Sequence, residues 1–252
     1  TNQPFGVNVM LKSPHAEEVA QMLVEEKVPV ITTGAGNPAK YMDAWLNAGI
    51  KVIPVIAACS MAKLSERVGA IALVAEGGES GGHIGELNTM PLVPQVCDAV
   101  SIPVIAAGGI GDGRGLAAAL MLGAVGVQIG TRFLSAKECC ISREYKERLL
   151  RAGDRDTIVT GRTLGHPVRS LKSPFSTTYA KMESDPAVSD EELEAFGVGS
   201  LRMAVQEGNP QKGSFIAGEI AGLVQKEQSA REIIEEIIRE AVECLEKASR
   251  YL

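Results

Sequence analysis

Residues 103–131, PVIAAGGIGDGRGLAAALMLGAVGVQIGT, contain the pattern that decides the fold. An apolar run, Pro103–Gly109, ends in paired glycines and is followed by a helical pattern over Asp112–Leu122. A second apolar run, Gly126–Thr131, again has glycine near its end. Continuous apolar runs without polar alternation are typical of strands buried on both faces of a parallel sheet. The stretch therefore predicts a strand–helix–strand unit with glycines at the C-terminal ends of its strands.

The same unit recurs towards the N-terminus. Four further apolar runs predict strands, at Phe5–Met10, Pro29–Gly34, Val52–Ala57 and Ala70–Gly77. Helical patterns separate the runs, at Pro14–Lys27, Pro38–Ala48, Met61–Val68 and Pro91–Val100. This rhythm of βα units fits a doubly wound sheet and a closed barrel alike. Glycines at the ends of several strands favour a (β/α)₈ TIM barrel, because barrel active sites are built at that face.

The strand count and the C-terminal half complete the predicted organisation. Six strands are recognisable where a barrel has eight, so we expect either that the first two βα units are missing or that the sheet is open. After Thr131 we expect helices over Arg132–Gly153, Ser189–Gly208, Gly213–Lys226 and Gln228–Leu252, with an irregular or short strand segment at Thr157–Leu171. We predict a barrel from residues 1–136 and 212–252, and a small helical substrate-side domain from residues 137–211.

Composition excludes several classes of protein. The 252 residues are 45% hydrophobic and 22% charged, as in an ordinary soluble globular protein. A net charge of -6 gives no general attraction to nucleic acid or to an anionic membrane. No apolar stretch is long enough to span a bilayer and no signal peptide is recognisable, so we expect a cytoplasmic protein. Five cysteines without a CxxC spacing and only three histidines predict neither a disulfide framework nor a metal site.

Two consecutive glycine-rich strand ends predict a phosphate site. Gly108 and Gly109 end one strand, and Gly130 and Thr131 end the next. Because glycine has no Cβ, backbone N–H groups there can approach a phosphate closely. These would be strands seven and eight of a barrel, where such folds commonly bind phosphate. The alternative is that the glycines only form tight turns.

A long glycine-rich loop contains the candidate catalytic residue. Residues 76–85 read EGGESGGHIG, and the interval between strand starts is longest here, at 33 residues. His83 follows two glycines, and imidazole titrates near neutral pH, so it is a candidate acid or base. Asn8 is a polar residue inside an apolar strand, and its amide would pair either with a heteroaromatic ring edge such as a flavin's or with neighbouring backbone.

The motifs together carry a family resemblance over essentially the whole chain. They are FGVNVM (5–10), ITTGAGNPAKYM (31–42), GGHIG (81–85), IPVIAAGGIGDGRG (102–115), VQIGTRF (127–133) and GRTLGHPVRSLK (161–172). In this order they resemble the FMN-dependent enoyl-[acyl-carrier-protein] reductase II (FabK) family, whose close relatives are the nitronate monooxygenases, or 2-nitropropane dioxygenases. The family fold is a (β/α)₈ barrel with a small substrate-side domain.

The resemblance implies roles for particular residues. The flavin ring and ribityl chain would be lined by Asn8, Glu76, Gly81, Gly82 and Gln128, and the phosphate would be held by Gly108, Gly109, Gly130 and Thr131. His83 matches the family's active-site histidine. Family members have two further βα units before FGVN, one of which lies beside the flavin, so we expect their absence to affect FMN affinity most.

The implied activity is reduction of trans-2-enoyl-[acyl-carrier-protein] in fatty acid elongation. The implied cofactors are FMN and NAD(P)H, with NADH as the expected donor and a monovalent cation left open. The expected partner is acyl carrier protein, for which Arg162, Arg169 and Lys172 are a candidate docking patch, and the expected assembly is a homodimer. His166 is a candidate for shaping the substrate domain or contacting cofactor.

Two other functions stay open. A nitronate monooxygenase would use the same FMN site, with the histidine as a base on a nitroalkane. Many oxygenase relatives carry an arginine after the loop histidine, and Ile84 at that position favours the reductase. The second alternative is a non-catalytic fragment or interaction module that does not bind FMN.

Overall fold

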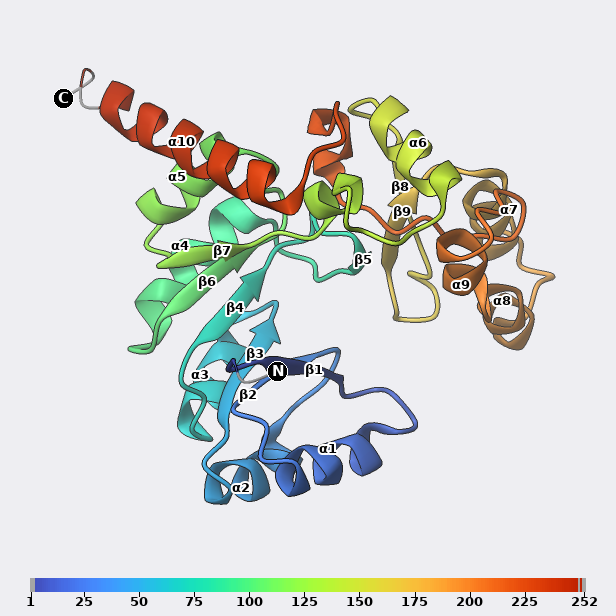
Figure 1. The fold of residues 1–252 in the computed structure, drawn as a ribbon. Helices are drawn as coiled ribbons and strands as arrows, with labels where there is room; N and C mark the ends of the chain where they lie inside the picture. The colour runs from blue at the N-terminus through green and yellow to red at the C-terminus, as the bar shows by residue number, and fades with distance from the viewer. Residues whose placement is uncertain (1–2, 249, 251–252) are drawn as a thin grey trace. The chain divides into compact units, whose positions relative to one another are not determined.

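The computed structural model describes residues 3–248 and 250, and the chain forms two compact units (Figure 1). The first unit comprises the chain up to Gly77 together with Glu86–Ala107 and Ala119–Gln128. The second comprises Gly78–Gly85, Gly108–Ala118 and the chain from Ile129 onward. The predicted domain boundaries near residues 136 and 212 lie inside the second unit and stay a prediction.

The first unit is built on a parallel sheet of six strands in the order β1-β2-β3-β4-β6-β7. Its strands are β1 (Gly6–Met10), β2 (Val30–Gly34), β3 (Lys51–Ile56), β4 (Leu73–Glu76), β6 (Val104–Ala107) and β7 (Gly126–Gln128). Each corresponds to one of the predicted apolar runs, so the six predicted strands are confirmed. In the part of the chain that the structure describes, β1 and β7 form the two edges of this sheet.

The strand order identifies the barrel type of α/β fold. Each strand pairs with the next strand of the unit in sequence, whereas a doubly wound sheet reverses its order at a switch point. Right-handed crossovers between successive neighbours place every connecting helix on the same face of the sheet. The helices are α1 (Ala16–Glu25), α2 (Ala39–Asn47), α3 (Cys59–Arg67), α4 (Thr89–Ala99) and α5 (Gly113–Met121). Figure 1 shows α1 and α2 on the same side of β1–β3.

Apolar packing between these helices and the sheet stabilises the first unit. Val9, Ile31 and Val52 are buried on the helix-covered face of neighbouring strands. Trp45 of α2 is fully buried among them, and its indole N–H donates to the carbonyl of Ala20 at 3.2 Å. Because side chains alternate between the two faces along a strand, the residues next to Val9, Ile31 and Val52 in sequence point to the other face of the sheet.

The second unit contains a small antiparallel sheet in the order β5-β9-β8. Its strands are β5 (Gly82–His83), β8 (Thr157–Thr160) and β9 (Val168–Leu171). Its helices are the 3-10 helices η1 (Thr131–Ser135) and η2 (Glu219–Leu223), and the α-helices α6 (Arg143–Arg151), α7 (Pro174–Glu183), α8 (Asp190–Gly197), α9 (Ser200–Val205) and α10 (Ala230–Ala248). The short strands expected within Thr157–Leu171 are thus confirmed.

Two clusters organise the helices of the second unit. Phe175 of α7 stacks on Phe196 of α8 with ring centroids 5.0 Å apart, and Tyr179 lies against both rings. The amphipathic helix α10 buries Ile233 and Ile237. The long C-terminal helix is confirmed over Ala230–Ala248, and residues 249, 251 and 252 of the predicted range lie outside the described residues.

The prediction of one helix over Arg132–Gly153 was wrong. The chain forms η1, then a non-helical segment whose Ala136 bridges to Gln228, and α6 starts afresh after Ser142. The Ser142 hydroxyl accepts from the N–H of Tyr145 at 3.4 Å, which caps the new helix. The long-range bridge interrupts a segment whose local pattern is helical throughout.

The predicted helix over Gly213–Lys226 was also wrong. Only the short η2 is helical there, and the segment before it packs on the glycine-rich loop. A Cβ on Gly218 would lie 2.6 Å from the carbonyl oxygen of Glu79. Tertiary contact between two backbones overrides the local helical pattern.

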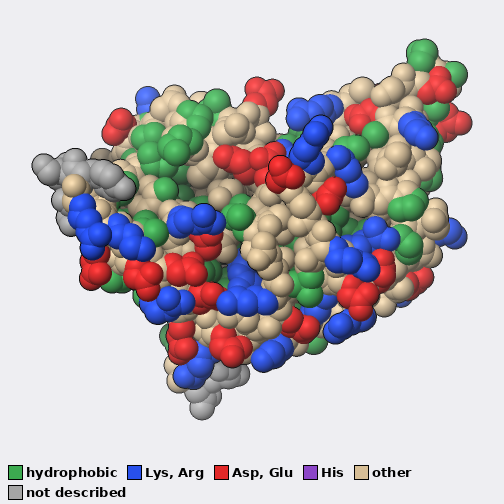
Figure 2. Space-filling view, turned by 90° about the horizontal axis from the view of Figure 1, so that it is seen from above, with side chains coloured by type: hydrophobic (Ala, Val, Ile, Leu, Met, Phe, Trp, Pro, Cys, Tyr) green, Lys and Arg blue, Asp and Glu red, His purple; other side chains and the backbone are tan. Residues whose placement is uncertain are grey.

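None of the described helices is both long and apolar enough to cross a bilayer. Figure 2 shows acidic and basic side chains interspersed over the face drawn, rather than gathered by sign.

Candidate functional site

Three predicted flavin-contacting residues share one face of the six-stranded sheet. Glu76 of β4 is in register with Ala107 of β6, which is in register with Gln128 of β7. Glu76 and Gln128 are thus two strand spacings apart, or about 10 Å. The registers from β1 through β2 and β3 to β4 place the side chain of Asn8 on the same face of the sheet as that of Glu76. All three side chains therefore project from the face opposite the core under α1 and α2.

Asn8 is held by a neighbouring side chain rather than by backbone. The hydroxyl of Thr32, its register partner on β2, donates to Asn8 Oδ1 at 2.9 Å. Asn8 is exposed on this face. The contact fixes the amide with its oxygen towards β2, which leaves the NH₂ group to donate to an acceptor atom of a ligand.

The glycine loops after β6 and β7 have the backbone geometry expected of an anion site. Gly108 and Gly109 have φ values of 88° and 70°, which favour glycine. A Cβ on Gly130 would meet no atom within 4 Å, so open space lies beside that backbone. The hydroxyl of Thr131 accepts from the N–H of Gly218 at 2.8 Å and keeps its own proton for a further acceptor.

The N-terminus of α5 is already occupied by carboxylates. Asp112 accepts from the N–H groups of Arg114 and Gly115, and Glu240 accepts from the N–H of Gly113. Any phosphate at this end of the second unit would therefore be held by the glycine loops rather than by the first turn of α5.

The glycine-rich loop containing His83 packs closely on the segment before η2. A Cβ on Gly81 would lie 2.6 Å from the carbonyl carbon of Ala217. The N–H of Glu219 donates to the carbonyl of Glu79 at 2.9 Å. Ser80 is buried, and its hydroxyl has no hydrogen-bond partner in the described structure. This hydroxyl can therefore donate to a group bound beside the loop.

Arg169 fixes the other side of the loop. Its guanidinium donates to the carbonyl of Gly78 through Nη2 at 2.9 Å and through Nε at 3.3 Å. The same Nη2 lies 2.9 Å from Oε1 of Glu219, and the Arg169 side chain is only 12% exposed. The predicted docking role of Arg169 is therefore not supported by its position, whereas Arg162 and Lys172 are exposed.

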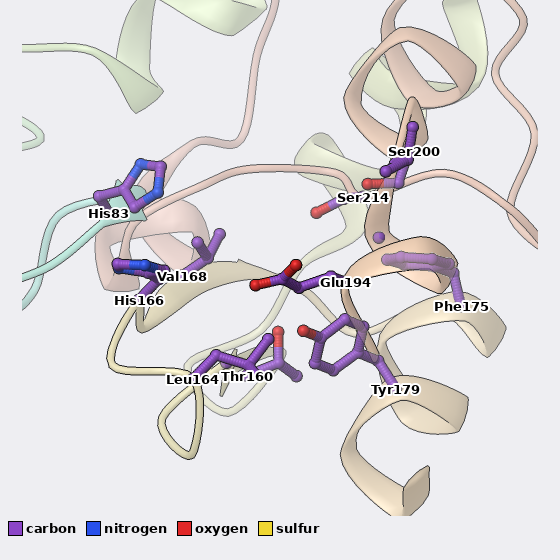
Figure 3. Close-up of a pocket in the computed structure, with 13 residues that line it drawn as sticks. His83, Thr160, Leu164, His166, Val168, Phe175, Tyr179, Glu194, Ser200 and Ser214 are labelled. Atoms are coloured by element: carbon purple, nitrogen blue, oxygen red, sulfur yellow. The ribbon is translucent and has the colours of Figure 1, made fainter. Parts of the chain in front are cut away.

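His83 lies at a pocket of the second unit (Figure 3). On β5, His83 pairs with Val168 of β9, and the next residue, Ile84, donates from its N–H to the carbonyl of Pro167. The pocket has a volume of about 340 Å³, within the range of small-molecule sites. Figure 3 shows the imidazoles of His83 and His166 together on one wall. His166 therefore belongs to the same site as His83.

The far wall of the pocket combines apolar and polar groups. Leu164 and Phe175 contribute apolar side chains to it. Figure 3 shows the Glu194 carboxylate near the hydroxyls of Thr160 and Tyr179, with Val168 nearer the two histidines. Burial raises the pKa of Tyr179, and the nearby carboxylates of Glu183 and Glu194 raise it further. Tyr179 is therefore a neutral hydrogen-bonding group near pH 7.

Sequence reasoning missed Tyr179 and Glu194. Both occur in helices whose local patterns are those of ordinary amphipathic segments, α7 and α8. Only the packing of α7 on α8 places the two residues at one wall, and no short-range spacing encodes that packing. The available signal was the pair of aromatic residues, Phe175 and Tyr179, in an otherwise polar stretch.

Comparison with known proteins gives the family. A family profile described as nitronate monooxygenase matches residues 1–240. A structure titled FabK from Thermotoga maritima is 50% identical, covers 100% of this chain and 80% of its own, and superposes with a TM-score of 0.96. The nitroalkane oxidase of Streptomyces ansochromogenes is 26% identical, with coverage of 98% and 83% and a TM-score of 0.83.

A further relative acts on a coenzyme A thioester. It is the (3aS,4S,5R,7aS)-5-hydroxy-7a-methyl-1-oxo-octahydro-1H-indene-4-carboxyl-CoA dehydrogenase of Mycobacterium tuberculosis, 33% identical over 99% of this chain and 81% of the relative. The profile and these likenesses span nearly the whole chain, and the barrel-type sheet and the glycine-rich strand ends agree with them. The chain therefore belongs to the nitronate monooxygenase family, a family of FMN-dependent oxidoreductases.

Proposed function

We propose that the protein is an FMN-dependent reductase that uses NAD(P)H to reduce trans-2-enoyl thioesters, with enoyl-[acyl-carrier-protein] as the substrate. The observation that carries the proposal is His83 on the wall of a largely apolar pocket. Such a pocket suits an uncharged enoyl thioester, and His83 suits proton delivery to it. The likeness to FabK, at 50% identity over the whole chain, supports the same activity.

The residues present fit FMN. In the second unit, the positive φ values of Gly108 and Gly109, the space beside Gly130 and the donor hydroxyl of Thr131 suit its phosphate. The orphaned hydroxyl of Ser80 offers another donor beside Gly81 and Gly82. In the first unit, Asn8, Glu76 and Gln128 share the sheet face to which we assign the flavin ring and ribityl chain.

The protein's part in the reaction is to position substrate and move a proton. When bound, FMN supplies the hydride chemistry between NAD(P)H and the β-carbon of the enoyl thioester. His83 donates the proton that the α-carbon needs, and a positioned general acid contributes about 10²–10⁴-fold to rate. Val168, the register partner of His83, gives the thioester end of the substrate an apolar neighbour. Arg169 holds the loop that presents His83.

The carrier is part of the same proposal. Acyl carrier protein and coenzyme A present their thioesters on the same pantetheine arm, and the mycobacterial relative is named for a coenzyme A thioester. Docking of acyl carrier protein would use the exposed Arg162 and Lys172, without Arg169. NADH as the donor, a cytoplasmic location and a homodimer complete the proposal.

A nitronate monooxygenase activity is the second candidate. The family profile carries that description, and the Streptomyces relative is a nitroalkane oxidase. His83 would then remove the proton α to a nitro group, and molecular oxygen would be consumed. Ile84 beside His83 favours the reductase, as does the higher identity to FabK than to the nitroalkane oxidase.

Steady-state assays on the FMN-supplemented protein separate the candidates. We expect NADH consumption without oxygen to depend on a crotonyl thioester, with one NADH used per double bond reduced. Oxygen consumption driven by nitroethane, without thioester-dependent NADH consumption, would establish the monooxygenase instead. A protein that binds no FMN would support the non-catalytic alternative.

A further inference from the structure

We propose that the wall formed by Thr160, Tyr179 and Glu194 binds the pantetheine arm of the thioester substrate, rather than its acyl chain. The inference rests on the proposed function, because it names the part of that substrate which this pocket takes. Its carrier is a phosphopantetheine thioester, on acyl carrier protein or on coenzyme A.

The chemistry of Glu194 decides between arm and acyl chain. An ionised carboxylate only accepts hydrogen bonds, so its partner must be a donor. An alkyl chain has no donor, and placing one against a carboxylate removes water from the charge without replacing its hydrogen bonds. The pantetheine arm carries two amide N–H groups. Figure 3 shows the Glu194 carboxylate directed into the pocket, where such an amide would lie.

Two hydroxyls complete the polar wall. Thr160 ends β8, and its hydroxyl lies near that of Tyr179 in Figure 3. A hydroxyl both donates and accepts, so these two groups can satisfy the amide carbonyls that Glu194 cannot. The raised pKa of Tyr179, caused by burial and by the neighbouring carboxylates, keeps its hydroxyl protonated for this role.

The order of groups along the pocket fits the order of groups along the arm. His83 and His166 form one end, Val168 follows, and Glu194 lies beyond Val168 (Figure 3). With the thioester at His83, the first methylenes of the arm lie over Val168 and the distal amide reaches Glu194. Phe175 and Val198 then offer apolar surface to the geminal methyl groups of the arm.

Substrates that differ only in the arm test the assignment. Crotonyl-pantetheine has both amides, whereas crotonyl-N-acetylcysteamine ends after the first amide. The variants are Glu194→Gln and Tyr179→Phe, which keep side-chain size, and the control is Glu191→Gln on the same helix outside the pocket. Each is measured as holoenzyme, with bound FMN quantified by its spectrum.

We expect Glu194→Gln to lower kcat/KM for crotonyl-pantetheine by about tenfold, because a neutral amide oxygen is a weaker acceptor for the substrate N–H than a charged carboxylate is. The same variant should change kcat/KM for crotonyl-N-acetylcysteamine by less than about twofold, because that substrate lacks the distal amide. Tyr179→Phe should show the same selectivity with a smaller loss, and Glu191→Gln should match the wild type with both substrates.

Three results would overturn the inference. The first is an equal loss with both substrates. The second is a loss that grows from crotonyl to decenoyl thioesters on one arm, which would assign the wall to the acyl chain. The third is a loss with crotonyl-acyl carrier protein but not with crotonyl-pantetheine, which would place the contacts on the carrier protein.

The same assays keep the inference separate from the proposed function. If the wild-type holoenzyme reduces no crotonyl thioester, the proposed function fails before the arm is tested. If the wild type reduces both substrates and the variants show no selectivity, only the arm assignment fails. Comparison of wild-type kcat/KM for crotonyl-coenzyme A and crotonyl-acyl carrier protein identifies which carrier supplies the arm.

Discussion

Replacement of Arg169 by Met should loosen the loop that presents His83. The guanidinium donates twice to the Gly78 carbonyl, at 2.9 and 3.3 Å, and lies 2.9 Å from Glu219. Met keeps the apolar stem but leaves the buried carbonyl without these donors. An unsatisfied buried acceptor costs about 1–3 kcal/mol. The ion pair adds little, since the Glu219 side chain is 48% exposed.

That loss in the free energy of unfolding should be visible in thermal unfolding. For a chain of this size each kcal/mol corresponds to about 2–4 °C, so Arg169→Met should lower Tm by roughly 2–12 °C. Arg162→Met is the matched control, because Arg162 is exposed and a surface change alters stability by about 0.5 kcal/mol or less. Calorimetry of the two variants at equal FMN saturation makes the comparison. If Arg169→Met and Arg162→Met unfold at the same temperature, the hydrogen bonds from Arg169 to the Gly78 carbonyl do not stabilise the fold as we argue.

Three further changes test other parts of the account. His83→Ala should lower turnover by about 10²–10⁴-fold and leave FMN bound, and normal turnover measured with a crotonyl thioester would remove His83 from the mechanism. Gly130→Ala should leave Tm unchanged, since its Cβ meets open space, yet raise the FMN Kd at least about tenfold in a fluorescence titration if the phosphate lies there. By contrast Gly81→Ala places a Cβ 2.6 Å from the carbonyl carbon of Ala217, so the free energy of unfolding measured in urea should fall by about 1–3 kcal/mol. Equal stability of this variant and the wild type would show that the loop can move away from Ala217 at no cost. Burial raises the pKa of Tyr145 in the folded state, so its contribution to stability is complete below the unfolded value of about 10 and is lost as pH rises above it. Tyr145→Phe should therefore flatten the loss of stability above about pH 10, and an unchanged pH profile would contradict that cause.

The barrel half of the fold was predictable because its signal is local. Runs such as Val104–Ala107 are apolar throughout, and glycines mark where each strand ends. The register of the parallel strands then shows which residues share a face of the sheet. Asn8, Glu76 and Gln128 are far apart in sequence, yet parallel pairing places them on one sheet face. Glycines at the strand ends favoured the barrel over a doubly wound sheet, and the observed strand order agrees with that choice.

The second unit was harder to predict because contacts distant in sequence shape it. Strand β5 has two residues and exists only through its pairing with β9. The segment before η2 is extended because it packs on the glycine-rich loop, although its sequence pattern is helical. The pocket wall from Tyr179 and Glu194 depends on helix packing. His83 was found because its glycine-rich setting is itself a sequence signal.

An anaerobic spectral cycle of the purified protein with FMN tests the central claim most directly. NADH is added first and a crotonyl thioester second, while the absorbance of bound flavin is followed. We expect NADH to bleach the bound flavin and the thioester to restore its colour, with His83→Ala slow in the second step. Bound flavin that NADH leaves coloured and a nitroalkane bleaches would contradict the reductase and establish the monooxygenase.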